Sequence, residues 1–204
     1  MEQRTEEWYS HRAGKVTASR IADIIATTKA GYSTSRENYL SELLIERLTG
    51  RHLDRFTSPA MEWGTMHEDD AANAYTERTF NIIEKVSFVD HPTIEHAGAS
   101  PDGYVDGDGL IEIKCPNTST HIATLMKKNI PSRYQSQMLW QMECTGRRWC
   151  DFVSFDPRLP PNLRLFIQRF EWDDARAFTI RNEVQKFLAD LKTKIDNLNN
   201  MYPG

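Results

Sequence analysis

The sequence predicts an α+β fold in which helices flank a central mixed β-sheet, in an α/β/α-like arrangement. Runs of β-branched and alternating apolar residues, typical of strands, gather between residues 81 and 170. Segments with apolar residues at helical spacing lie before, among and after these runs. The 204 residues suffice for a full hydrophobic core, and no repeat or clear linker divides them. We therefore expect residues 1–204 to form a single domain.

Start and stop signals delimit the expected elements. Thr17 and Ser19 are plausible N-caps, Pro59 suits the first turn of a helix, and Gly50 suits the position after a helix. Helices are expected over 5–12, 20–26, 35–48, 59–75, 119–128, 134–143 and 173–199. Strands are expected over 81–90, 94–99, 147–156 and 163–170, with polar loops over 27–34 and 51–58.

The stretch 100–116 predicts a β-hairpin, because Asp-Gly pairs at 106–109 separate two extended runs. Side chains alternate along a strand, so Ile111 and Ile113 share one face and are expected to be buried. Glu112 and Lys114 share the other face, which places a carboxylate and an ammonium group side by side.

Asp102, on the first strand of this hairpin, can meet Glu112 and Lys114 across it. Converging carboxylates bind Mg²⁺ or Mn²⁺, and a neighbouring lysine can orient or deprotonate a water. These are the requirements of metal-assisted phosphodiester hydrolysis. A calcium loop is excluded, because Tyr104 and Ile113 stand where an EF-hand needs acceptors. On local composition alone, a turn followed by a surface ion pair remains an alternative.

Other metal ligands are few. Glu68 is a candidate third carboxylate, although a lone acid in an acidic helix is usually solvated. The pair His67-Glu68 is not a zinc-protease motif, because Ala71 stands where the second histidine belongs. The three cysteines form no C-x-x-C pair, which argues against a disulfide framework and a structural zinc site.

Two features suggest a polyanionic partner. Arg12 and the hydroxyls of Thr17 and Ser19 stand near a predicted helix N-terminus, which favours phosphate, although such hydroxyls often only cap helices. The net charge is −4, yet the acidic block over 60–112 is followed by a basic block over 113–150. This pattern suits an enzyme that holds a polyanion beside its metals, with ordinary solvated faces as the alternative.

No apolar run is long enough to cross a membrane, and the acidic, polar N-terminus differs from a signal peptide. We therefore expect a cytoplasmic protein with no membrane partner.

Several motifs occur in a fixed order along residues 5–158. They are Trp8…Arg12-x-Gly14-x-Val16-Thr17-Ala18-Ser19, Trp63-Gly64-x-x-x-Glu68-x-Asp70-Ala71, Ser100-Pro101-Asp102-Gly103, Glu112-Ile113-Lys114-Cys115-Pro116, Tyr134-x-x-Gln137 and Phe155-Asp156-Pro157-Arg158. Asp102 with Glu112-Ile113-Lys114 resembles the D-(D/E)-x-K signature of the restriction-endonuclease-like nucleases. The whole set resembles the phage lambda exonuclease-like family of viral-type recombination nucleases.

The resemblance implies a restriction-endonuclease-like core and a Mg²⁺-dependent 5′–3′ exonuclease, with Mn²⁺ as the alternative ion. Such an enzyme digests the 5′ strand of linear double-stranded DNA, releases 5′-mononucleotides and leaves 3′ overhangs for recombination. The resemblance further implies a homotrimeric ring, a single-strand annealing protein as partner, and the cytoplasm of a phage's bacterial host as location.

Roles for individual residues follow from the same resemblance. Asp102, Glu112, the Ile113 carbonyl and Glu68 would bind metal, while Lys114 and Gln137 would attend the nucleophilic water. Arg12, Ser19 and Ser100 would bind the terminal 5′-phosphate, and Met61 would be the wedge that splays the duplex end. Two metals would stabilise the attacking water and the leaving oxygen, and beside them the pKa of Lys114 is expected to fall.

The sequence leaves two alternatives. One is another nuclease of the same superfamily, such as an endonuclease; an iron–sulfur type is disfavoured, because four cysteine ligands are needed and the chain has three. The other is a non-catalytic module that binds DNA ends, which would not need Asp102, Glu112 and Lys114 together.

Overall fold

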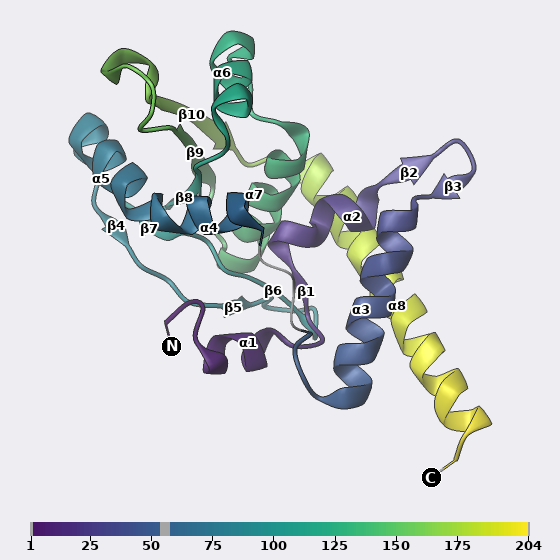
Figure 1. Ribbon diagram of the computed structural model, residues 1–204. Helices are drawn as coiled ribbons and strands as arrows, with labels where there is room; N and C mark the ends of the chain where they lie inside the picture. The colour runs from purple at the N-terminus through teal and green to yellow at the C-terminus, as the bar shows by residue number, and fades with distance from the viewer. Residues whose placement is uncertain (1, 54–57, 204) are drawn as a thin grey trace.

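The computed structural model describes residues 2–53 and 58–203 and has helices on both sides of a mixed five-stranded sheet (Figure 1). The strand order is β10-β9-β8-β7-β4, in which β8 and β9 run parallel and the other neighbours are antiparallel. The strands are β4 (Ile83–Glu84), β7 (Gly103–Val105), β8 (Gly109–Lys114), β9 (Trp149–Phe155) and β10 (Leu165–Glu171). The predicted α+β class with a central mixed sheet is thus confirmed.

Two smaller sheets accompany the main one. The first contains β1 (Val16–Thr17), β6 (Ala97–Ala99) and β5 (Val89–Asp90), with β6 parallel to β1 and antiparallel to β5. The second is a hairpin of β2 (Thr27–Thr28) and β3 (Gly31–Tyr32), which projects from the body of the molecule in Figure 1.

Most of the predicted helices are confirmed to within two or three residues. The helices are α1 (Glu6–Arg12), α2 (Ile21–Ile25), α3 (Thr34–Thr49), α4 (Pro59–Met66), α5 (Glu68–Thr79), α6 (Thr118–Lys127), α7 (Ser132–Thr145) and α8 (Asp174–Met201). Short 3-10 turns cover Ala18–Arg20 and Pro161–Leu163. Among the residues described, no helix is both long and apolar enough to pass through a bilayer.

Three sequence predictions were wrong in detail. The helix expected over 59–75 is two helices, because His67 leaves helical geometry (φ −108°, ψ 7°) and the acids at 68–70 favour a new N-terminus. The strand expected over 81–90 is β4 and β5, which belong to different sheets. The loop expected over 27–34 contains the β2–β3 hairpin, and the loop over 51–58 lies partly outside the described residues.

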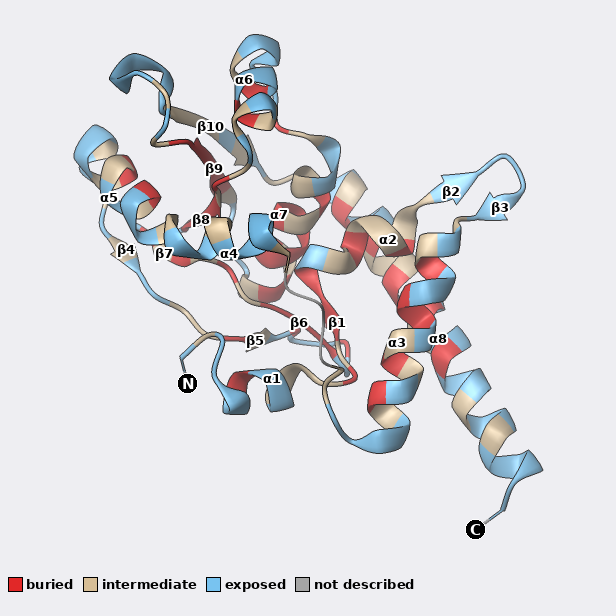
Figure 2. Ribbon diagram, viewed as in Figure 1, coloured by how far each residue is buried: buried red, intermediate tan, exposed pale blue. Residues whose placement is uncertain are grey.

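Two apolar clusters cover the two faces of the main sheet. In Figure 2 much of β9 and α7 has the colour of buried residues. On one face Leu110 and Phe152 pack with α2, α3, α7 and α8. On the other face Ile111 and Ile113 pack against Ala71 and Tyr75 of α5. The predicted burial of both isoleucines on one face is confirmed. Their alternation turns Glu112 toward α7 on the opposite face.

Candidate active site

Asp102 and the strand β8 meet at one end of the hairpin. The Ile113 backbone N–H donates to Oδ2 of Asp102 at 2.6 Å. Because β7 and β8 pair with Gly103 opposite Ile111, Asp102 lies beside the last residues of β8. The Asp102 carboxylate thereby lies near Glu112 and Lys114, close enough for both charges to act on it.

The Glu112 side chain is buried within a ring of donors. Gln137 Nε2 donates to its Oε1 at 2.6 Å, and Gln141 Nε2 donates to its Oε2 at 2.7 Å. The Lys114 ammonium pairs with the same carboxylate. The two glutamines lie one turn apart on α7, which packs over this face of the sheet. The structure therefore brings Gln137 to the predicted site and adds Gln141, whose role the sequence did not predict.

The clustered charges shift two pKa values. Burial and the neighbouring Glu112 carboxylate hold the pKa of Asp102 well above its ordinary value, although Lys114 opposes the shift. For Lys114, burial disfavours the charged form, but the Glu112 and Asp102 carboxylates outweigh it and raise the pKa. From the sequence, metal cations are expected to lower the pKa of Lys114. The protein's own side chains shift this pKa in the opposite direction, because the groups that act on it most strongly are carboxylates.

Glu68 is the first residue of α5, and its carboxylate pairs with the Arg4 guanidinium. It is near enough to Asp102 to contribute to the raised pKa of that residue. Within residues 2–53 and 58–203, no three His, Cys, Asp or Glu side chains form a ready metal cluster. The donor set nevertheless fits a hard divalent cation, because carboxylates converge and the cations Lys114 and Arg4 already pair with two of them.

Trp8 links two of the three predicted phosphate ligands. The Arg12 guanidinium lies 3.7 Å from the Trp8 ring centroid, and Trp8 Nε1 donates to Ser100 Oγ at 3.1 Å. Ser19 lies at the same end of the small sheet as Ser100. Thr17 of β1 pairs with Gly98 of the parallel strand β6, and Ser19 and Ser100 each follow two residues after this pair. Ser19 is exposed there.

The backbone next to Arg12 is fixed by α3. The Gly14 N–H donates to Glu46 at 2.7 Å, and its carbonyl accepts from Arg47 Nε at 2.9 Å. Gly14 has φ +71°, and a Cβ there would lie 2.7 Å from Arg47 Cγ. The sequence indicated only the apolar stripe of α3. Glu46 lies on this helix and is 2% exposed, and a buried glutamate is a sign of a role other than core packing.

Met61 lies on α4 and is 55% exposed, so its side chain is available to a ligand. Trp63 of this helix contacts the His67 ring in a tilted arrangement, with ring centroids 4.0 Å apart, and the Arg158 guanidinium lies 4.1 Å from the Trp63 ring centroid. Arg158 in turn donates to Asp156 and to the carbonyl of Pro116, just beyond β8. These contacts connect the candidate wedge to the strand that carries Glu112 and Lys114.

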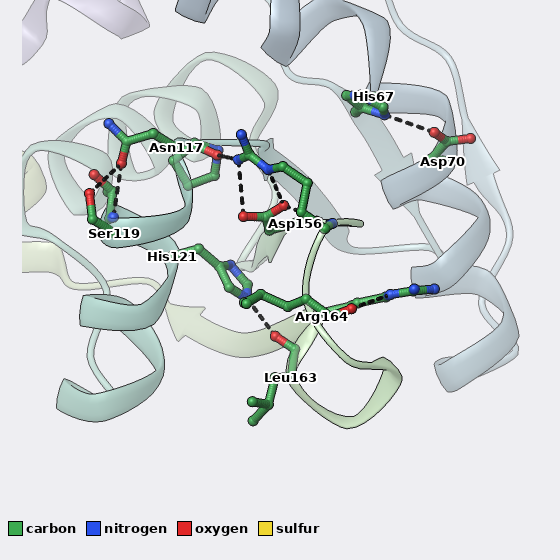
Figure 3. Close-up of polar contacts among 12 residues, drawn as sticks. His67, Asp70, Asn117, Ser119, His121, Asp156, Leu163 and Arg164 are labelled. Atoms are coloured by element: carbon green, nitrogen blue, oxygen red, sulfur yellow. Dashed lines mark hydrogen bonds and ion pairs between the residues drawn. The ribbon is translucent and has the colours of Figure 1, made fainter.

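Asp156 and the neighbouring His121 fix the segments around this end of the sheet (Figure 3). Burial opposes the Asp156 charge, but hydrogen bonds from Arg158 and Thr118 lower the pKa of Asp156 to about 2. His121 bonds through Nδ1 to the Ser154 hydroxyl at 2.7 Å and through Nε2 to the Leu163 carbonyl at 2.8 Å. Asp156 and His121 are therefore structural groups that hold α6 and Arg158.

Residues 7–148 match the YqaJ-like viral recombinase domain family. The chain is 49% identical to LHK-Exo, an alkaline exonuclease from Laribacter hongkongensis, with 97% of each chain covered and a TM-score of 0.90. The structure of LHK-Exo in complex with dAMP gives the same identity and coverage, with a TM-score of 0.91.

A phage-related exonuclease from Haemophilus somnus shares the fold at 16% identity, with coverage of 92% of this chain and 96% of that chain and a TM-score of 0.70. No curated protein matches the chain. The predicted restriction-endonuclease-like fold and the predicted nuclease class are confirmed. With well over half of its length matched, the chain belongs to the YqaJ-like viral recombinase family.

Proposed function

We propose that this protein is a Mg²⁺-dependent 5′–3′ exonuclease that acts on linear double-stranded DNA, releases 5′-mononucleotides and leaves 3′ overhangs. The observation that carries the proposal is the convergence of Asp102, Glu112 and Lys114 at one end of the sheet. The dAMP complex of LHK-Exo, a relative at 49% identity, agrees with a nucleotide product.

Asp102, Glu112, Glu68 and the Ile113 carbonyl would hold two Mg²⁺ ions, with Mn²⁺ as a substitute. Bound ions would lower the pKa of a water and offset charge on the scissile phosphate. Lys114 would orient that water and move its proton at Nζ. Gln137 and Gln141 keep the Glu112 carboxylate fixed through both oxygens, so that it meets the ions without reorganising.

Arg12, Ser19 and Ser100 would bind the terminal 5′-phosphate. A guanidinium with two hydroxyls is a suitable anion site, and Trp8 fixes Arg12 and Ser100 relative to each other. Ser100 lies two residues before Asp102, so the pocket is adjacent to the metal ligands. Every cut creates a new 5′-phosphate that this pocket can take, which favours movement in one direction.

Met61 would enter the end of the duplex and separate its strands, because an exposed apolar side chain can stack on an unpaired base. We further propose a homotrimeric ring, a single-strand annealing partner and action in the cytoplasm of a bacterial host, as the resemblance to the lambda exonuclease-like family implies. A single nuclease domain over 1–204 is part of the proposal.

The test is digestion of linear duplex DNA, labelled separately at each 5′ and 3′ end, with Mg²⁺. We expect mononucleotides from the 5′ label first and a growing 3′ single strand. Glu112→Gln should lower this activity by about 10²-fold or more. Glu171→Gln, at the exposed last residue of β10, is the control and should leave it unchanged. Cleavage of closed circular DNA would instead indicate an endonuclease, and activity retained by Glu112→Gln would refute the assigned site.

A further inference from the structure

The N-terminal segment lies against the candidate active site and is anchored there. Gln3 Nε2 donates to the Val86 carbonyl at 2.7 Å and to the Pro101 carbonyl at 2.8 Å. Pro101 directly precedes Asp102, so these bonds tie the segment to a candidate metal ligand. Thr5 caps α1 by accepting from the Trp8 N–H at 3.3 Å. The segment thus connects the carboxylate site to the phosphate pocket.

Arg4 lies between these two anchors. Its φ of +68° is in the left-handed region, which is uncommon for a residue with a side chain. Its guanidinium pairs with Glu68, and the two side chains are 45% and 29% exposed. Arg4 is therefore held by Glu68, one of the carboxylates proposed to bind metal.

We infer that Arg4 is an internal counter-ion that occupies Glu68 until a divalent cation displaces it. The inference rests on the proposed function, since it takes Glu68 as a metal ligand. A guanidinium bound to a carboxylate uses oxygen lone pairs that a metal requires, and it repels the incoming cation. A partly exposed ion pair is weak compared with metal coordination, so the metal wins the exchange.

The exchange has a consequence for the DNA. The hydrogen bonds of Gln3 and Thr5 do not involve Glu68, so an Arg4 side chain released from Glu68 would stay tethered beside the metal ligands. A guanidinium at this place can contact a backbone phosphate of the bound strand. Metal loading and the positioning of a DNA-binding group are thereby coupled through one residue.

The test measures Mn²⁺ binding to the full chain without DNA, by electron paramagnetic resonance titration. Arg4→Gln should bind Mn²⁺ about two- to five-fold more tightly than the unsubstituted protein, the range expected for loss of a partly exposed competing pair. Lys85→Gln is the matched control. Lys85 pairs with Asp69, the residue after Glu68 in α5, and its side chain is 86% exposed. The Lys85→Gln substitution therefore removes a neighbouring positive charge without freeing Glu68. Equal or weaker binding by Arg4→Gln, or an equal gain in Lys85→Gln, overturns the inference.

A double-mutant cycle separates this inference from the proposed function. Glu68→Gln should weaken Mn²⁺ binding, and Arg4→Gln should have no effect in the Glu68→Gln background. If Glu68→Gln weakens binding while Arg4→Gln alone does not strengthen it, the inference fails and the metal site stands. If Glu68→Gln leaves binding unchanged, the ligand role of Glu68 fails and the inference with it. Thermal unfolding in EDTA confirms that each variant is folded.

Discussion

Gln141 donates from Nε2 to Oε2 of Glu112 at 2.7 Å, one helical turn beyond the Gln137 amide that donates to Oε1. Both side chains come from α7, and both Gln141 and Glu112 are fully buried. A buried carboxylate whose two oxygens are each held by an amide has a fixed orientation. Gln141 therefore positions the residue that we propose binds metal.

Replacing Gln141 with Leu should lower kcat by about 10- to 100-fold, the range typical for loss of a group that orients a metal ligand. The change leaves Oε2 of Glu112 without this donor and lets the carboxylate rotate. Steady-state digestion of 5′-phosphorylated duplex checks the rate, and Mn²⁺ titration checks the weaker metal binding. Gln185→Leu, at an exposed position of α8, is the control for substitution by an apolar residue. Unchanged kcat in Gln141→Leu would show that Gln137 and Lys114 suffice.

Asp102→Asn should make the metal-free protein more stable while it removes activity. Burial and Glu112 raise the pKa of Asp102, so the folded state binds this proton more tightly than the unfolded state. Stability therefore declines as pH rises above the ordinary aspartate pKa, and Asn, which cannot ionise, avoids the loss. In EDTA at pH 7 we expect a Tm higher by about 2–4 °C, equivalent to about 1 kcal/mol.

Scanning calorimetry of Asp102→Asn at pH 7 and at pH 4 tests this sign, because the gain should shrink at the lower pH. Asp196→Asn, in an exposed ion pair with Lys192, serves as control and should change Tm little. A lower Tm for Asp102→Asn in EDTA would contradict the prediction. Added Mg²⁺ should stabilise the unsubstituted protein and not Asp102→Asn.

The active-site hairpin was predictable because its signals are local. The Asp-Gly turn, the alternation of Ile111 and Ile113 with Glu112 and Lys114, and the short distance to Asp102 all lie within fifteen residues. Its partners depend on contacts that no local pattern records. Trp8 meets Ser100 across 92 positions, and Gln141 meets Glu112 across 29.

The errors in secondary structure have the same origin. The segment 81–90 is uniformly strand-like, but the chain uses it to pass from the main sheet to the small one, so β4 and β5 pair with different partners. The continuous apolar pattern over 59–75 concealed the break at His67, whose ring lies tilted against that of Trp63. Tertiary contacts determine where the chain changes sheets within 81–90 and help to set the helix break at His67, and hydrophobic periodicity alone does not predict either feature.

Asp156→Asn should destabilise the protein at neutral pH and lose its effect in acid. Its pKa of about 2 lies below the ordinary 3.8, so the contribution is present above the ordinary value and lost as pH falls toward 2. We expect a cost of about 1–2 kcal/mol at pH 7, from the weakened bonds to Arg158. Urea unfolding at pH 7 and pH 3 measures it, with Asp196→Asn again as reference. A cost that does not depend on pH would mean that the Asp156 charge is not its source.

Gly14→Ala should weaken the phosphate pocket as well as the fold. Its φ of +71° disfavours any side chain, and the new Cβ would displace Arg47 from the position where it binds the Gly14 carbonyl. Gly50→Ala is a matched control, because it has φ +66° with nothing within 4 Å of the added Cβ. Gly50→Ala should lose about 1 kcal/mol of stability. Gly14→Ala should lose more, because Arg47 must move, and only Gly14→Ala should also lose preference for 5′-phosphorylated ends. An equal end preference in the two variants would argue against a link between Gly14 and Arg12.

Arg12 should provide most of the discrimination between 5′-phosphoryl and 5′-hydroxyl DNA ends. The Arg12 guanidinium is held over Trp8, whose indole N–H donates to Ser100, so a terminal phosphate would meet a prearranged cation and hydroxyl. A charge-assisted hydrogen bond of about 1.5–3 kcal/mol corresponds to about a 10- to 100-fold difference in kcat/KM between the two ends. Arg12→Ala should reduce this ratio to near one by slowing only the phosphorylated substrate, while Arg78→Ala, at an exposed position of α5, should preserve it. Matched duplexes that differ only in the terminal phosphate measure the ratio. If the unsubstituted protein digests both ends at the same rate, the pocket does not bind the terminal phosphate, and Arg12 has another role.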